Sequence, residues 1–153
     1  MKKTVLTMMM MGVMLIGFAQ QRQLPMSEYV VSKELNEYLT PAKVEQMRAN
    51  QPAELIRMNY IMLNGEKLIT KELGGNTKDM GYLKDYAPAG VVYNEAEILD
   101  KSWINPFLWN LPQDQYRTNI FKLKNSDYFI MVLPTSVMEE RINAQMQQYG
   151  VHK

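Results

Sequence analysis

The sequence predicts an α+β fold with an antiparallel sheet of about four or five strands, built from two hairpins. N-terminal helices and a C-terminal helix are expected to pack on one face of this sheet. Two observations lead to this prediction. Apolar residues recur at helical spacing near both ends of the chain, and two pairs of β-rich runs flank the turn dipeptides Asn64-Gly65 and Asn125-Ser126.

The first 19 residues predict export. Lys2 and Lys3 precede an apolar run from Val5 to Phe18, and small residues, Gly17 and Ala19, end the segment. This segment resembles a bacterial Sec signal peptide, which implies cleavage near Ala19-Gln20 and a periplasmic or secreted product. A retained N-terminal anchor is the alternative, although about 15 apolar residues fall short of the ~20 that a spanning helix needs.

Residues 20–153 are then expected to form a single small domain, and no later apolar run is long enough to span a membrane. Removing Lys2 and Lys3 from the 17 basic residues leaves 15 against 16 acidic residues. Without a basic excess, binding to nucleic acid is not expected. The chain has no cysteine, which excludes disulfides, thiolate metal ligands and a cysteine nucleophile.

Helices are predicted in three short segments near the start of the domain. Residues 27–39 place apolar side chains on one helical face, and Pro41 suits the first position of a second helix over residues 41–50. Residues 52–58 offer one or two further helical turns. Pro41 and Pro52 break the pattern, so the sequence predicts a cluster of short helices rather than one long helix.

The two hairpins are predicted at residues 58–71 and 117–134. Asn64-Gly65 suits a type I′ turn, with strands at about 58–63 and 66–71. Between the hairpins, a short strand over residues 90–93 and a helix capped by Asn94 are expected. The C-terminal helix is predicted to begin with Ser136 and Glu139 as a capping box and to end before Gly150.

Residues with catalytic potential are few, and the sequence predicts no metal site and no cofactor. The single histidine, His152, is next to the last residue, where a side chain is usually solvated. No serine has a suitably spaced lysine or an internal histidine. A pair of carboxylates could still meet in space to hydrolyse a glycoside. The candidates are Glu95, Glu97, Asp100 and Asp114.

The stretch "WINPFLWNLPQDQY", residues 103–116, holds both tryptophans of the chain. One interpretation is a lid folded over the core, because a buried tryptophan contributes too much to stability to be left outside. The other is a binding loop, because amide groups lie beside aromatic rings. For the second interpretation, the predicted ligand- or partner-binding residues are Trp103, Trp109, Tyr116, Arg117 and Asn110.

These features together favour an exported, non-catalytic domain that binds another component of the cell envelope, in an accessory or assembly role. The alternative is a module that binds a small molecule or a glycan through the aromatic-amide loop. A carboxylate-based hydrolase is a third hypothesis. The expected partner is therefore an envelope protein or a glycan.

Overall fold

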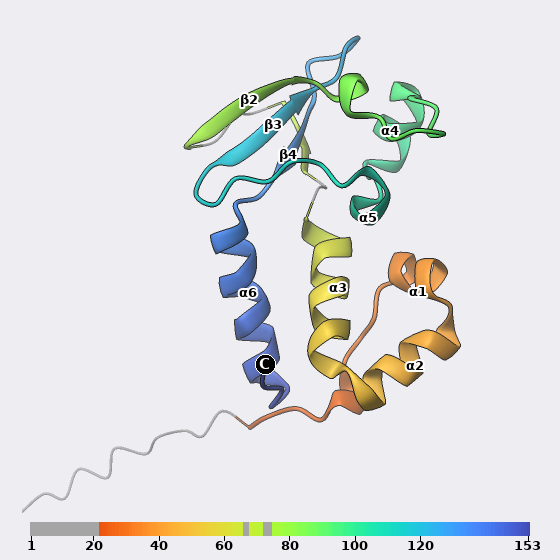
Figure 1. Ribbon diagram of the computed structural model, residues 1–153, viewed down its shortest axis with the longest axis vertical. Helices are drawn as coiled ribbons and strands as arrows, with labels where there is room; N and C mark the ends of the chain where they lie inside the picture. Colours follow the sequence, from red (N-terminus) through yellow and green to blue (C-terminus); the bar gives the residue numbers. More distant parts are fainter. Residues whose placement is uncertain (1–21, 66–67, 72–74) are drawn as a thin grey trace, which may run out of the picture.

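The computed structural model describes residues 22–65, 68–71 and 75–153, and they form an α+β fold. Figure 1 shows two parts: a sheet with short helices beside it, and a group of longer helices that extends away from the sheet. The predicted signal peptide, residues 1–19, falls outside the described residues.

The helical part combines the start and the end of the chain. It contains the 3-10 helix η1 (Met26–Glu28) and the α-helices α1 (Lys33–Leu39), α2 (Pro41–Asn50), α3 (Pro52–Asn64) and α6 (Thr135–Gln148). Proline occupies the first position of α2 and of α3, where no backbone hydrogen bond is lost. The Ser32 side chain caps α1 by accepting a hydrogen bond from the backbone N–H of Leu35 at 3.1 Å.

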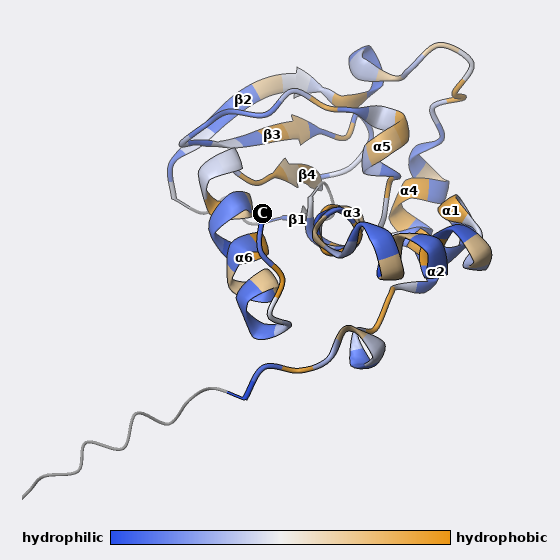
Figure 2. Ribbon diagram, turned by 60° about the horizontal axis from the view of Figure 1, so that its bottom comes forward, coloured by the Kyte–Doolittle hydropathy of each residue, from blue (hydrophilic) through white to orange (hydrophobic). Residues whose placement is uncertain are grey.

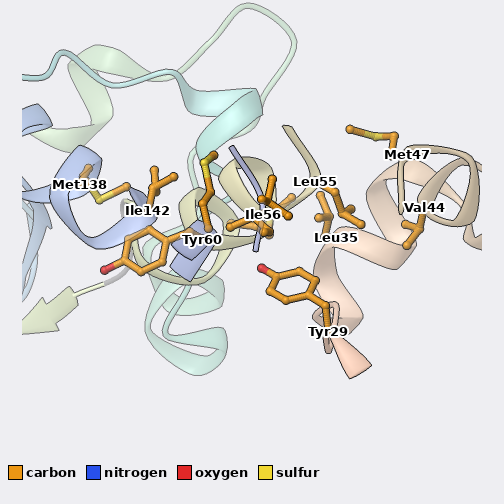
Figure 3. Packing of buried hydrophobic residues seen from close by; sticks show 12 residues of the cluster. Tyr29, Leu35, Val44, Met47, Leu55, Ile56, Tyr60, Met138 and Ile142 are labelled. Atoms are coloured by element: carbon orange, nitrogen blue, oxygen red, sulfur yellow. The ribbon is translucent and has the colours of Figure 1, made fainter. Parts of the chain in front are cut away.

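These helices bury their apolar faces against one another. In Figure 3, Met138 and Ile142 of α6 lie beside Tyr60 of α3, and Leu35 of α1 lies beside Leu55 of α3. Figure 2 shows α3 and α6 below the strands of the sheet, with hydrophilic residues along most of α6. We call this buried set the helical core; its members are Tyr29, Leu35, Val44, Met47, Leu55, Ile56, Tyr60, Met62, Met138, Ile142, Met146 and Val151.

One buried polar side chain attaches the N-terminal segment to α3. The Asn59 side-chain oxygen accepts a hydrogen bond from the backbone N–H of Ser32 at 2.9 Å. Its side-chain nitrogen donates to the Tyr29 hydroxyl at 3.0 Å and to the Val30 carbonyl at 3.2 Å. Because all these groups are paired, the burial of this amide does not leave an unsatisfied polar group.

The sheet has the strand order β1-β4-β3-β2. Its strands are β1 (Leu68–Thr70), β2 (Thr77–Tyr82), β3 (Thr118–Lys122) and β4 (Phe129–Val132). β4 pairs antiparallel with both β1 and β3, whereas β2 pairs parallel with β3. The parallel pair is possible because residues 83–117 form a long crossover connection between its two strands.

That crossover connection covers one face of the sheet. It contains the 3-10 helix η2 (Leu83–Tyr86) and the helices α4 (Glu95–Lys101) and α5 (Pro106–Trp109). Phe121 and Ile130 are register partners, so they lie on the same face of the sheet. We call the buried set on this face the sheet core; its members are Leu83, Ile98, Ile104, Trp109, Leu111, Phe121, Leu123, Ile130 and Val132.

The structure confirms the α+β class, the hairpin of β3 and β4, the helix α2 and a C-terminal helix. Gly150 follows this last helix with φ at 65°, the left-handed conformation expected of a glycine there. The predicted capping box is wrong, since α6 begins one residue before Ser136, with Pro134 as its N-cap. Asn94 does cap α4, accepting a hydrogen bond from the backbone N–H of Glu97.

Three parts of the predicted sheet are wrong. The first predicted hairpin does not form, because residues 58–63 continue α3 and Gly65 has a right-handed φ of −66°. The sheet is mixed rather than antiparallel, because β2 runs parallel to β3. Residues 91–93, in the predicted strand 90–93, have no regular structure.

The prediction that the terminal helices pack on a face of the sheet is also wrong. They pack mainly against one another, and the short helices of the crossover connection take their place on the sheet. Within residues 22–65, 68–71 and 75–153, no helix has the length and apolar character needed to cross a membrane.

Candidate functional site

A groove lies between α4 and α5, and both tryptophans line it. Its volume is about 160 Å³. Its apolar walls come from Ile98 of α4, Ile104 of the following loop and Leu108 of α5, and Val92 lies at its edge. Figure 1 shows α4 and α5 together at one side of the sheet, away from α6.

Two capped helices fix the positions of the tryptophans. Ser102 ends α4 with φ at 49°, which turns the chain toward Trp103. The Asn105 side chain then caps α5 by accepting hydrogen bonds from the backbone N–H groups of Phe107 at 3.0 Å and Leu108 at 3.3 Å. Trp109 is the last residue of α5. The alternation of caps and short helices therefore decides which side chains face the groove.

Both tryptophans contribute to a core as well as to the groove. Trp109 is only 8% exposed and belongs to the sheet core. Trp103 is half-buried and packs against the helical core. Residues 103–109 therefore cover core residues, as the lid interpretation expects, while the same two rings form part of the groove wall. Their predicted role in binding stays a prediction.

Two exposed apolar side chains border the groove. The Val92 side chain is 86% exposed and that of Leu108 is 52% exposed. Along α4, Lys101 pairs with Glu97, one helical turn earlier. The groove thus combines apolar, aromatic walls with a pair of opposite charges on its α4 side.

The structure separates the other predicted site residues from the tryptophans. Tyr116 is 70% exposed and lies in a turn where the Asp114 carboxylate accepts hydrogen bonds from the backbone N–H groups of Tyr116 at 2.9 Å and Arg117 at 3.0 Å. The Arg117 guanidinium also pairs with Asp114 at 3.3 Å. Asn110 follows α5 and lines a different depression. Of the five residues predicted to bind a ligand or partner, Trp103 and Trp109 line the α4–α5 groove and the other three do not.

The candidate carboxylates have structural partners. Glu95 is buried and accepts hydrogen bonds from the backbone N–H groups of Lys124 at 3.0 Å and Asn125 at 2.9 Å. Glu97 pairs with Lys101, and Asp114 holds the turn described above. The backbone hydrogen bonds from Tyr116 and Arg117 lower the pKa of Asp114.

Burial, followed by the hydrogen bond to Glu95, raises the pKa of Tyr93 to about 12. Asp100 is exposed on α4, and His152 is exposed beyond α6. Within the part of the chain that the structure describes, no three histidine, aspartate or glutamate side chains gather where they could hold a metal ion.

Sequence reasoning missed the contribution of α4 to the groove. Asn94, Glu97, Ile98 and Lys101 all line it. Their positions follow the i, i+3, i+4, i+7 spacing of one helical face. This spacing, in a helix that ends just before Trp103, could have indicated that one face of the helix lies beside the tryptophan. The exposure of Val92 had no comparable signal in the sequence, because residues 90–93 were predicted to form a strand of the sheet.

Comparisons of this chain with protein-family models, with curated proteins and with solved structures found no match.

Proposed function

We propose that this protein is an exported, non-catalytic domain that binds another protein of the cell envelope through the α4–α5 groove. The observation that carries the proposal is a small aromatic groove bordered by exposed apolar side chains. Trp103 and Trp109 form the walls, and Val92 and Leu108 border them. Tryptophan in a desolvated pocket is a typical centre of a protein interface.

The size of the groove favours a protein partner over a small molecule. Pockets for small ligands usually have volumes of about 300–1,000 Å³. A groove of about 160 Å³ is below that range and suits one side chain projecting from a larger surface. The Glu97–Lys101 pair on the wall offers both signs of charge to polar groups around that side chain.

The exposed apolar side chains support the same proposal. Val92 and Leu108 contribute nothing to either core, and they leave apolar surface in water beside the groove. Covering them would stabilise a complex by about 25 cal/mol for each Å² of apolar surface removed from water. The location in the periplasm or outside the cell is part of the proposal and rests on the sequence of residues 1–19.

The experiment is site-specific photo-cross-linking in the native host. A photoreactive amino acid replaces Val92 or Leu108 in two proteins, and Val30 in a third. Val30 is the matched control, because it is apolar and 80% exposed but lies in the segment between η1 and α1. We expect positions 92 and 108 to cross-link to the same envelope protein, and position 30 not to do so.

The purified partner then allows a quantitative test. Leu108→Ser should weaken binding by about tenfold or more, as for an apolar side chain that a partner buries, while Val30→Ser should leave it unchanged. Cross-links that form equally from all three positions, or from none, would refute the proposed interface. Both substitutions are at exposed positions, so the proteins should fold like the wild type.

A further inference from the structure

A second, larger depression lies between α3 and α5, on a different side of α5 from the groove. Its volume is about 500 Å³. It occupies the junction of the two cores, where α5 lies beside the end of α3 that leads to the sheet (Figure 1). Binding sites for small molecules often form at such junctions. Its apolar lining consists of Ile61, Pro106, Phe107, Leu111 and Pro112.

The polar lining of this depression consists of two amide side chains, Asn110 and Gln113. Both residues are exposed, and each amide can donate and accept hydrogen bonds. No residue that lines the depression carries a charge. This composition suits a ligand that is itself uncharged, with hydroxyl groups for the amides and C–H surfaces for the apolar wall.

The wall that carries the amides is held in place by backbone hydrogen bonds. Asn110 has a left-handed φ of 45°, and its N–H donates to the Pro106 carbonyl at 2.9 Å. The Pro112 carbonyl accepts a hydrogen bond from the buried Asn119 side chain at 2.8 Å. Shortly after the amides, the Asp114 carbonyl accepts from the Thr135 N–H at 3.0 Å. A wall that is ordered before binding loses less entropy when a ligand arrives.

The aromatic ring of the depression is fixed as well. Phe107 stacks on Tyr38 of α1, with ring centroids 5.5 Å apart and an interplanar angle of 17°. The contact with Tyr38 therefore fixes the orientation of the Phe107 ring in the wall of the depression. An oriented ring beside oriented amides is a geometry that can select one face of a sugar.

We propose that this depression binds a neutral carbohydrate. The apolar wall and Phe107 contact the C–H face of a sugar ring, and Asn110 and Gln113 bond to its hydroxyl groups. An acidic sugar would bring a carboxylate to a wall without a cation, and an apolar peptide would leave the two amides without partners. The site is distinct from the α4–α5 groove, so a protein partner and a carbohydrate could bind at the same time.

The test uses calorimetric titration of the purified domain with short neutral oligosaccharides of glucose, of N-acetylglucosamine and of mannose. Oligogalacturonate serves as the acidic comparison. Asn110→Gly removes one amide and keeps a residue that tolerates the left-handed backbone, and Gln113→Ala removes the other. Gln115→Ala is the matched control, because Gln115 is exposed in the same segment but does not line the depression.

We expect at least one neutral oligosaccharide to bind saturably, with an affinity that does not depend on salt. Asn110→Gly and Gln113→Ala should each weaken this binding by about tenfold, as for one lost hydrogen bond, and Gln115→Ala should not. The proposal is overturned if no neutral oligosaccharide binds, if oligogalacturonate binds as well, or if the control weakens binding equally. Cross-linking from positions 92 and 108 is unaffected by these substitutions, so the two proposals fail independently.

Discussion

The carboxylate of Glu139 lies where α6 meets α3. It pairs with the Arg57 guanidinium through two contacts, one of them from Arg57 Nη2 to Glu139 Oε2 at 2.8 Å. Lys153 Nζ approaches the same oxygen at 3.4 Å. The hydrogen bonds from Arg57 are the main reason that the pKa of Glu139 falls from 4.5 to about 2.

This pKa predicts how stability depends on pH. The pKa is lower in the folded state than in the unfolded state, so the pair stabilises the fold above pH 4.5 and loses its effect as the pH falls toward 2. Because the Glu139 side chain is 40% exposed, the contribution at pH 7 should be about 0.5–1 kcal/mol. We expect Glu139→Gln to lower the free energy of unfolding by that amount at pH 7 and to have no effect near pH 2.

Urea unfolding of both proteins between pH 2 and pH 7 measures this difference. The matched control is Glu140→Gln, on the same helix and exposed, which should follow the wild type across the whole range. A difference between wild type and Glu139→Gln that persists unchanged at the lowest pH would show that the ionised carboxylate is not its source.

At the scale of elements, Glu95 connects α4 to the turn between β3 and β4. Its carboxylate accepts hydrogen bonds from two backbone N–H groups of that turn and from the Tyr93 hydroxyl at 3.0 Å. Glu97, two residues along the same helix, pairs with Lys101 in solvent. These two glutamates therefore provide a comparison of the same side chain in a buried and an exposed setting.

We predict that Glu95→Gln lowers the free energy of unfolding by about 1–3 kcal/mol. The amide NH2 group that replaces one carboxylate oxygen is a donor and cannot accept a hydrogen bond from the backbone N–H groups of the turn. Glu97→Gln should cost about 0.5 kcal/mol or less, as for an exposed pair within one helix. Urea unfolding measures both values. Equal losses for the two variants would mean that Glu95 does not hold the β3–β4 turn.

The elements that the sequence predicted correctly are those with strong local signals. Pro41 begins α2, Asn94 caps α4, and the apolar spacing of residues 138–149 predicted a helix there. The Asn64-Gly65 signal failed because the helical spacing that begins at Leu55 and Ile56 continues through Tyr60 and Met62, so that α3 ends only at Asn64. Burying that whole helical face stabilises the protein by more than a two-residue turn preference can.

The candidate site was predicted only in part, for a comparable reason. Local composition indicated an aromatic segment and named Trp103 and Trp109, which do share a groove. Composition could not show that Asn110 and Tyr116 lie outside this groove, because the left-handed backbone at Asn110 changes the direction of the chain after α5. The apolar border formed by Val92 and Leu108 depends on which side chains the fold leaves uncovered.

At the scale of the whole molecule, two cores meet at short connections. Val132 belongs to the sheet core and its neighbour Leu133 packs against the helical core. Each tryptophan reports on one core, since Trp109 lies in the sheet core and Trp103 packs against the helical core. The two cores can therefore be followed separately by fluorescence in the variants Trp103→Phe and Trp109→Phe.

We predict that both single-tryptophan proteins report the same unfolding transition as circular dichroism, because adjacent residues tie the cores together. Adding Ile130→Ala, at a fully buried position of the sheet core, should cost about 2–5 kcal/mol and shift both fluorescence signals equally. A shift confined to Trp109 fluorescence would show that the helical core unfolds independently.

The sequence by itself determined the α+β class, the β3–β4 hairpin and the positions of α2, α4 and α6, because spacing, prolines and caps act over a few residues. Only the tertiary structure decided that β2 pairs parallel with β3, that α3 continues through residue 64, and that the terminal helices form their own core. It also decided which surfaces remain exposed beside Trp103 and Trp109. These features depend on contacts between residues far apart in the chain, and no local pattern specifies which distant partner a side chain meets.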